Sequence, residues 1–394
     1  MSTDIPARQW TDADSAPGTG GGIATVAPAP ALSPETSAGA SVNADVDVDV
    51  NVDVDVAHVD VDVNLGAGTS AATTVTGHGL AHHLLHRPST AEGLMLGTVA
   101  PVPQDFTLSA ALPDAHPLFN DGPGAFHDPN FALEAMRQSV LFVAHQYFRV
   151  PSQRPVVLAS SEVGITGLEA WRRNGHTAHI AVDMALHPVD VVNGVPRGLR
   201  CEAELAIDGM RCGTAKARTV FLMPKVYQNH RARGRAASRT EKFGVFSDGH
   251  GHDHARPRPE AVGRADPHNV VIGLPKALDD GTLRVQVVPD AAHPVFTANA
   301  TDHVPSVVLL EASRQAAFLA AGELHGFSAA TCVLTEWNAR FRGFAEIDLP
   351  LHCTVAAGPL GRGPGGHPAF PVTLTFAQGS REIATVGVTV LQDY

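Results

Sequence analysis

The chain of 394 residues has little that points to a membrane or to an oxidising compartment. It contains four cysteines, none of them in a CxxC pair, and no window of about 18 uninterrupted apolar residues. It also lacks the basic start and apolar run of a secretory signal. These absences predict reduced, buried thiols, no membrane span and a cytoplasmic location.

Positive charge is nearly absent from residues 1–79, where Arg8 is the only basic residue beside eleven acidic ones. This tail therefore carries −10 of the net charge of −12 and leaves −2 for the remainder. Its few aromatic residues and the Asp-Val alternation over 45–63 predict a disordered acidic tail, because a strand with so many carboxylates would repel its partner. An acidic interaction tail is the alternative. The nearly neutral remainder, without a helix-turn-helix segment, argues against nucleic-acid binding.

Motifs that bind cofactors are also missing. The chain has no GxGxxG or Walker loop, and the glycine run at 361–366 contains Pro364, as a loop between strands would. His250, His252 and His254 have the chemistry of metal ligands, but they lie in a linker without a supporting fold. We therefore expect no cofactor and no metal.

What the chain does contain is an internal repeat. The string His-Pro-x-Phe, then fourteen residues, then Glu-Ala-x-Arg-Gln begins at His116 and again at His293. Seven identities recur at an offset of 177 residues, which predicts two copies of one fold.

Each copy carries an apolar helix followed by strand-like runs. The helices are expected over 131–148, with Asp128 as N-cap and Pro129 as first residue, and over about 304–324. A strand is also expected at 269–273, and a hairpin turn at Asp208-Gly209. The other expected strands lie at 94–109, 155–165, 177–192, 199–208, 211–223, 329–342, 346–357, 370–378 and 381–391.

This order predicts an α+β fold, a tandem (double) hotdog in which each antiparallel sheet wraps around a long central helix. The two sheets are expected to join edge to edge as an intrachain pseudo-dimer, which removes exposed edges. The domains would be the tail at 1–79, an N-terminal hotdog at 80–227, a linker at 228–266 and a C-terminal hotdog at 267–394. The linker is basic and His-rich and is predicted to be flexible. A landing patch for an acidic carrier protein is the alternative.

The repeated motif places a carboxylate, a guanidinium and an amide on one helical face, at i, i+3 and i+4. Charges on so apolar a helix need partners, so each set either ties the halves together or faces a pocket and a ligand. The candidate residues of these two sets are Glu134, Arg137 and Gln138, and Glu311, Arg314 and Gln315.

Histidines accompany both motifs. His116 and His293 open the loops before the helices and are either structural or general bases near neutral pH. His127 and the pair Asp302-His303 directly precede the helices, whose free N–H groups can bind an oxyanion. Simple capping is the alternative for Asp302 and His303. The candidate catalytic set is therefore Glu134, Glu311, His116, His293, His127 and His303, and the candidate substrate-binding set is Arg137, Arg314, Gln138, Gln315 and Asp302.

The stretch from Val304 to Gln315 resembles the helix of β-hydroxyacyl carrier-protein dehydratases of hotdog fold. It departs from them in the longer His-to-Glu spacing and in Arg314, which stands where they have a small residue. With Asp302-His303-Val304-Pro305, His86-Arg87 and the doubled motif, residues 85–394 are more similar to the A-factor biosynthesis hotdog family. The acidic tail and the His-rich linker are not features of that family.

The resemblance implies an acyltransferase without a cofactor. It would move a β-ketoacyl group from an acyl carrier protein to the hydroxyl of dihydroxyacetone phosphate, giving a phosphorylated β-keto ester on the way to a γ-butyrolactone signal. In this interpretation Arg314 anchors the phosphate, so that Arg314→Ala would abolish product without unfolding the protein. His116 would face Glu311, and His293 would face Glu134. The alternatives are a dehydratase or thioesterase, and a non-catalytic acyl or butyrolactone-binding protein.

Overall fold

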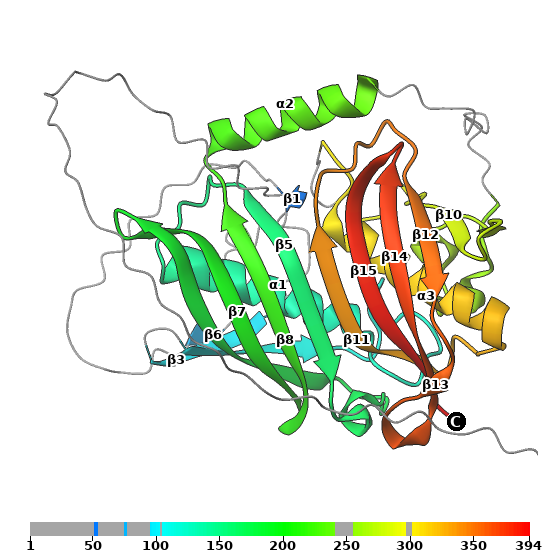
Figure 1. The fold of residues 1–394 in the computed structure, drawn as a ribbon. Helices are drawn as coiled ribbons and strands as arrows, with labels where there is room; N and C mark the ends of the chain where they lie inside the picture. The colour runs from blue at the N-terminus through cyan, green and yellow to red at the C-terminus, as the bar shows by residue number, and fades with distance from the viewer. Residues whose placement is uncertain (1–50, 54–74, 77–94, 103–104, 241–254, 297–301) are drawn as a thin grey trace, which may run out of the picture. The chain divides into compact units, whose positions relative to one another are not determined.

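The computed structural model describes residues 51–53, 75–76, 95–102, 105–240, 255–296 and 302–394, all within the unit Asp47–Tyr394. Their strands form one antiparallel sheet with two halves (Figure 1). The first half runs in the order β4 (Asp105–Leu112), β6 (Ala178–Val192), β7 (Val195–Ile207), β8 (Met210–Phe221) and β5 (Val156–Ile165). The second half mirrors it as β10 (Leu283–Gln286), β12 (His352–Ala357), β14 (Pro368–Gln378), β15 (Arg381–Gln392) and β11 (Cys332–Phe341).

The two halves meet where β5 pairs with β11, in a register that sets Gly164 opposite Glu336 and Ser160 opposite Arg340. Each of these strands would otherwise be an open edge with unpaired N–H and C=O groups. The remaining short strands are β1 (Asn51–Asp53) on β5, β2 (Val75–Thr76), β3 (Met95–Val102), β9 (Lys276–Ala277) and β13 (Gly361–Arg362).

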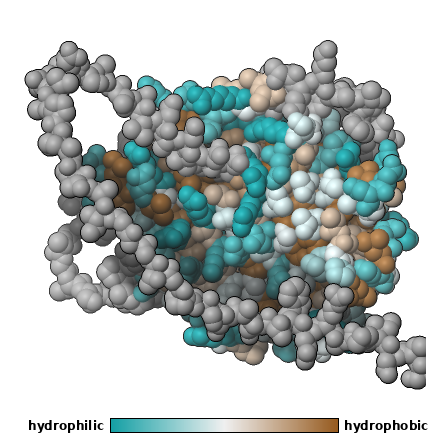
Figure 2. All heavy atoms as spheres, in the orientation of Figure 1, coloured by the Kyte–Doolittle hydropathy of each residue, from teal (hydrophilic) through white to brown (hydrophobic). Residues whose placement is uncertain are grey.

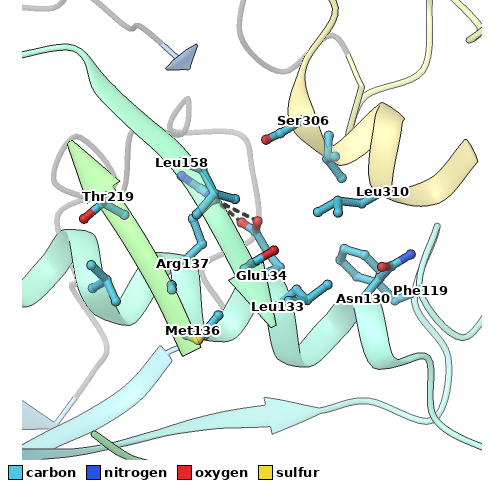
Figure 3. A pocket seen from close by; sticks show the side chains of 14 residues that line it. Phe119, Asn130, Leu133, Glu134, Met136, Arg137, Leu158, Thr219, Ser306 and Leu310 are labelled. Atoms are coloured by element: carbon cyan, nitrogen blue, oxygen red, sulfur yellow. Dashed lines mark hydrogen bonds and ion pairs between the residues drawn. The ribbon is translucent and has the colours of Figure 1, made fainter. Parts of the chain in front are cut away.

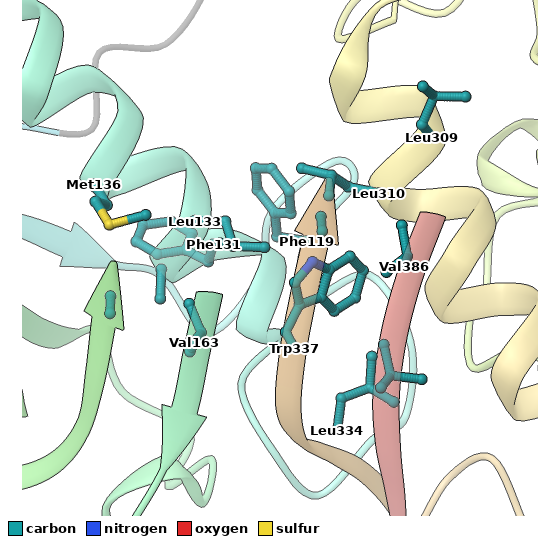
Figure 4. Close-up of a cluster of buried hydrophobic side chains, with 14 of the residues drawn as sticks. Phe119, Phe131, Leu133, Met136, Val163, Leu309, Leu310, Leu334, Trp337 and Val386 are labelled. Atoms are coloured by element: carbon teal, nitrogen blue, oxygen red, sulfur yellow. The ribbon is translucent and has the colours of Figure 1, made fainter. Parts of the chain in front are cut away.

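Two long helices, α1 (Pro129–Gln146) and α3 (Ser306–His325), lie against the same face of this sheet (Figure 1). Both are buried for most of their length, so apolar residues occupy nearly every position. Figure 4 shows side chains of the two helices converging over the central strands, with Trp337 of β11 between them. Asp128 caps α1 and Pro129 is its first residue, as predicted. The double hotdog is thereby confirmed.

The linker differs from the prediction in its described part. It contains most of a helix, α2 (Pro224–Thr240), and a short 3-10 turn at Pro259–Val262, and a second such turn follows it at Pro267–Asn269. α2 is held because Arg231 is buried against Glu346, with Nη1–Oε1 at 2.6 Å and Nη2–Oε2 at 2.9 Å. The strand expected at 269–273 is wrong: only a single bridge, Ile272 to Val287, forms there.

Several predictions fall wholly or partly outside the described residues. Strands β1 and β2 lie within the expected tail, and the rest of residues 1–79 is outside. So are the histidines at 250, 252 and 254 and the pair His86-Arg87. Within the part of the chain that the structure describes, none of the helices combines the length and apolar character that crossing a membrane requires.

Candidate active site

The first Glu-Ala-x-Arg-Gln motif lies on the buried face of α1, where its polar side chains bond to one another. Nε and Nη2 of Arg137 donate to the two oxygens of Glu134, each at 2.9 Å. Gln138 Nε2 donates to Glu134 Oε1 at 2.9 Å. The planar guanidinium matches the carboxylate in two parallel bonds, which fixes the orientation of both groups.

This motif lines a pocket between α1, the inner face of the sheet and the start of α3 (Figure 3). The space within this lining measures about 580 Å³ when its open mouth is counted, and about 30 Å³ of it admits the centre of a water-sized sphere. Its polar lining is Glu134, Arg137, Asn130, Ser161, Thr219 and Ser306. Its apolar lining is Phe119, Leu133, Met136, Val140, Leu158, Ala217, Val307 and Leu310.

Ser306 and Val307, the first residues of α3, bring that helix's N-terminus to the pocket. The first N–H groups of a helix have no partner within the helix. In α1, Asp128 Oδ1 accepts from the N–H of Asn130 at 2.9 Å. Among the described residues no side chain caps α3 in this way, since its N-cap is Pro305. The pocket therefore faces N–H donors and the positive end of a helix dipole.

The second motif has different surroundings, because Glu311 is completely buried among donors. Arg314 Nε and Nη2 donate to it at 3.3 and 3.2 Å, and Gln315 Nε2 donates at 2.6 Å. Arg264 adds two further bonds. Burial alone would raise the pKa of Glu311, but the charges of Arg264 and Arg314 outweigh it and lower the pKa to about 2. The surrounding guanidinium groups therefore keep this carboxylate ionised at neutral pH.

Arg264 connects the second motif to the first half of the protein. Its Nη2 donates to Asp128, the cap of α1, at 2.7 Å, and its Nη1 donates to Asp121 at 3.1 Å. Three carboxylates thus surround one buried guanidinium, and their charges raise the pKa of Arg264 despite the opposing effect of burial. Arg314 Nη2 in turn donates to the carbonyl of Val262 at 3.0 Å.

His116 and His293 have local partners. His116 Nδ1 accepts from the N–H of Phe119 at 3.0 Å, and His293 Nδ1 accepts from the N–H of Val295 at 3.2 Å. An accepting Nδ1 is unprotonated, and burial lowers the pKa of His293. The expected cross-pairs are corrected: among the described residues no hydrogen bond joins His116 to Glu311 or His293 to Glu134.

His293 is instead linked to Glu311 in its own half. Its Nε2 lies 2.7 Å from Asn269 Oδ1, so the neutral ring donates there. The backbone carbonyl of Asn269 accepts a hydrogen bond from Gln315 Nε2 at 2.6 Å, and Gln315 Nε2 also donates to Glu311. These contacts tie the His-Pro-x-Phe loop to the second motif.

The other candidates at the helix starts lie away from the pocket lining. His127 Nδ1 is 3.2 Å from Asn120 Nδ2, and burial, with the charge of Arg173, lowers the pKa of His127 to about 4. His303 Nδ1 lies 3.0 Å from Asp302 Oδ1. That hydrogen bond and the charge of Arg231 lower the pKa of Asp302, although burial opposes them.

Two contributors escaped the sequence analysis. Arg264 lies in the segment that the sequence analysis predicted as a basic linker, and the need of a buried Glu311 for a cation was foreseeable. Asn130 gave no signal beyond its place two residues after Asp128. It lines the pocket, and its Oδ1, like Ser161 Oγ, has no hydrogen-bond partner among the described residues.

Two joined hotdog halves, each with a Glu-Arg-Gln motif on its central helix, define a double-hotdog protein. The chain belongs to the A-factor biosynthesis hotdog domain family, whose model matches residues 72–223 and 248–392.

Relatives bear a common name. The chain is 29% identical over 279 residues to the 2-oxo-3-(phosphooxy)propyl 3-oxoalkanoate synthase of Streptomyces coelicolor, covering 70% of this chain and 82% of that protein. It is 28% identical over 295 residues to the synthase of the same name from Streptomyces virginiae, covering 74% and 90%. Among solved structures, an acyl-ACP thioesterase from Bacteroides thetaiotaomicron has a TM-score of 0.41 at 12% identity, covering 72% of this chain and 97% of that one.

Proposed function

We propose that this protein is an acyltransferase that joins a β-ketoacyl group from a thioester to the hydroxyl of dihydroxyacetone phosphate. The product is a 2-oxo-3-(phosphooxy)propyl 3-oxoalkanoate, as in the name of its relatives, and a precursor of a γ-butyrolactone signal. One observation carries the proposal: a bonded Glu134–Arg137 pair lines a pocket whose wall is otherwise mostly apolar. The apolar wall suits an acyl chain, and a guanidinium suits a phosphate.

The pocket offers a group for each part of the reaction. Glu134 takes the proton of the acceptor hydroxyl as general base. Arg137 attracts the acceptor phosphate by its positive charge and donates to it through guanidinium N–H groups other than the two that bond Glu134. The N–H groups at Ser306 and Val307 face the thioester carbonyl and stabilise the negative charge that develops on its oxygen. Because α1 and α3 come from different halves, this arrangement makes the chain an intrachain pseudo-dimer.

The chemical step follows from these positions. The hydroxyl oxygen of the acceptor attacks the thioester carbonyl carbon, while its proton passes to Glu134. The resulting oxyanion collapses, the carbon–sulfur bond breaks, and the sulfur leaves as a thiol with the proton returned by Glu134. No redox partner is needed, because the reaction exchanges a thioester for an oxygen ester. The apolar lining excludes the water that would otherwise hydrolyse the thioester.

We propose that chemistry takes place at Glu134 and not at Glu311. Arg264, Arg314, Gln315 and Asn130 donate to Glu311 inside the protein, so this carboxylate holds the halves together. Arg314, the phosphate anchor expected from the sequence, also packs over the ring of Phe318. In our proposal Arg137 takes over that role.

The acyl donor is proposed to be an acyl carrier protein that docks on α2. This helix has no acidic residue, and Lys225, His230 and Arg233 are exposed along it, beside the exposed Met223 and Val226. Figure 2 shows hydrophilic surface along α2, at the top of the view. An acidic carrier complements this charge. With such a donor we also propose a cytoplasmic location.

The position of α2 supports this docking surface. Tyr227 packs against the cluster of Val157 and Phe344. Val157 is the sequence neighbour of Leu158 in the pocket wall. At its other side, Arg231 Nε donates to Asp302 at 3.2 Å, shortly before α3 begins. α2 is therefore anchored to segments that flank the pocket on both sides.

The decisive experiment is product analysis by mass spectrometry. Purified protein is incubated with a β-ketoacyl thioester, with and without dihydroxyacetone phosphate. A phosphorylated ester that forms only with the acceptor supports acyl transfer. Loss of the thioester at the same rate without the acceptor would instead indicate a thioesterase, and dehydration of a 3-hydroxyacyl thioester would indicate a dehydratase.

A further inference from the structure

Asn130 connects the two Glu-Ala-x-Arg-Gln motifs through one amide group. It comes from α1 of the first half, yet its Nδ2 donates to Oε2 of Glu311 on α3 of the second half, at 3.2 Å. The side chain is 4% exposed and lines the pocket of Glu134. Figure 3 shows it beside Phe119 and below Leu310. The side chain thus belongs to the pocket and to the second motif at once.

The direction of this amide is set by its surroundings. Glu311 is ionised by Arg264 and Arg314, so it accepts hydrogen bonds only and must face the NH₂ side of Asn130. The backbone N–H of Asn130 is also held, by Asp128 Oδ1, and the other oxygen of Asp128 binds Arg264. With the backbone and Nδ2 both fixed, Oδ1 is left as a buried acceptor without a partner among the described residues.

An unpaired buried acceptor costs free energy unless a ligand completes it. The two copies of the repeat differ at this position. The residue 177 positions after Asn130 is Val307, which also lines the pocket but has no polar side chain. Only one of the two helices therefore presents an amide oxygen to the pocket. A ligand that matches it must bring a hydrogen-bond donor.

The order of the pocket-lining residues along α1 indicates which hydrogen-bond donor of the ligand faces Asn130. Asn130, Glu134 and Arg137 follow one another on one helical face, with Asn130 about 6 Å along the axis from Glu134. Met136 and Val140 line the pocket beyond Glu134, on the side away from Asn130. If the acyl chain of the donor lies beside Met136 and Val140, the part of the donor on the other side of the thioester sulfur lies beside Asn130.

We infer that Asn130 Oδ1 accepts a hydrogen bond from the amide N–H of the pantetheine arm of the acyl donor, and that the second motif serves to hold Asn130 in this orientation. The inference rests on the proposed function. In a pantetheine thioester this N–H follows the sulfur after a two-carbon link, so it extends about one helical turn from the reacting carbon. The acceptor hydroxyl does not qualify, because its single proton goes to Glu134.

The test uses two small acyl donors that differ at one atom. The first is a 3-oxoalkanoyl N-acetylcysteamine thioester, which has the amide N–H, and the second is the same compound with an ester oxygen in place of that N–H. The full-length protein is assayed with each donor and dihydroxyacetone phosphate. We expect the wild type to prefer the amide donor by about tenfold in kcat/KM, the size of one neutral hydrogen bond.

In Asn130→Ala this preference should fall to about one, while KM for dihydroxyacetone phosphate is unchanged. Asn338→Ala, an exposed asparagine on β11, is the matched control and should keep the tenfold ratio. If Asn130→Ala does not fold, Asn130→Ser, which is too short to reach, replaces it. Glu311→Gln should lower the preference without changing KM for the acceptor, as expected of a positioning residue.

The outcomes separate the two proposals. Equal rates with both donors in the wild type, or an unchanged ratio in the Asn130 variants, would overturn the role of Asn130 and leave the acyltransferase intact. A wild-type protein that makes no phosphorylated ester from either donor would overturn the proposed function, and this inference with it.

Discussion

The guanidinium of Arg264 and the carboxylate of Glu311 face each other inside the protein, joined by two hydrogen bonds across 47 residues of sequence. The pair links the end of the connection between the halves to the central helix of the second half. Through Asp128 it reaches the start of the first central helix as well. The second motif is therefore part of the interface between the halves, which leaves the first motif for the pocket.

Replacing Arg264 should destabilise the protein strongly. In Arg264→Met, Glu311, Asp128 and Asp121 lose a buried cation, and we expect the free energy of unfolding to fall by about 3–5 kcal/mol. Urea denaturation of the variant and the wild type measures this loss. The control is Arg211→Met, which removes an exposed pair with Glu204 and should cost about 0–1 kcal/mol. Equal losses in the two variants would contradict the structural role of Arg264.

The two glutamates should respond differently to the same change. Glu134→Gln removes the proposed base and should lower kcat by about 10²–10⁴-fold, with a smaller loss of melting temperature than Glu311→Gln because Glu134 has fewer buried partners. Glu311→Gln keeps the base but weakens the buried ion pairs, so it should lower the melting temperature and retain most of kcat. Initial rates and thermal unfolding of both variants provide the comparison. A larger loss of kcat in Glu311→Gln would move the chemistry to the second motif.

Substitutions of the two motif arginines should also differ, one in substrate binding and the other in stability. Arg137→Gln should raise KM for dihydroxyacetone phosphate by about 10–100-fold, because a charge-assisted bond to phosphate is lost, and should leave KM for the thioester nearly unchanged. Arg314→Gln should act mainly on stability, since Arg314 holds Glu311 and the Val262 carbonyl. Steady-state kinetics in both substrates decide between them. If KM for dihydroxyacetone phosphate rose only in the Arg314 variant, the sequence-based prediction that Arg314 anchors the phosphate would be correct.

Charge reversal on α2 should affect only a carrier-bound donor. In Lys225→Glu combined with Arg233→Glu, like charges would face the acidic carrier, and kcat/KM for the carrier-bound thioester should fall at least about tenfold at low salt. The rate with a small thioester should not change. Arg197→Glu, an exposed charge reversal on β7, is the matched control. Equal effects on both donors would argue against α2 as the docking surface.

Burial of His127 should make the fold sensitive to mild acid. The pKa of His127 is lowered to about 4 from an ordinary value of 6.5, so the unfolded chain takes up a proton more readily. Stability should therefore be constant above about pH 6.5 and fall by about 3 kcal/mol between pH 6.5 and pH 4, with no further loss from this group below that. His127→Gln should flatten this part of the profile. Unfolding free energies measured across pH 4–7.5 provide the test, and identical slopes would contradict it.

Local patterns were enough to predict most of the elements. The apolar positions of the two central helices and the alternation in the strands follow from short-range geometry, and so do the Asp128-Pro129 helix start and the Asp208-Gly209 turn, where both residues have positive φ. α2 was missed because its dense positive charge was interpreted as a flexible linker, although its Arg and Ala residues favour a helix. It is held through Arg231, whose partners Glu346 and Asp302 are 115 and 71 residues away.

The doubled motif, the double hotdog and the kinds of groups available for acyl transfer could all be predicted from the amino-acid sequence. Tertiary packing settles which glutamate lines the pocket between the two helices and which is buried among ion pairs. The two copies are identical at the repeated positions, so their difference lies in what the fold brings to them. Arg264 and Asn130 reach Glu311 from distant parts of the chain, and an apolar pocket forms beside Glu134. The partners of a buried charge are chosen by packing across the whole chain, which local sequence does not encode.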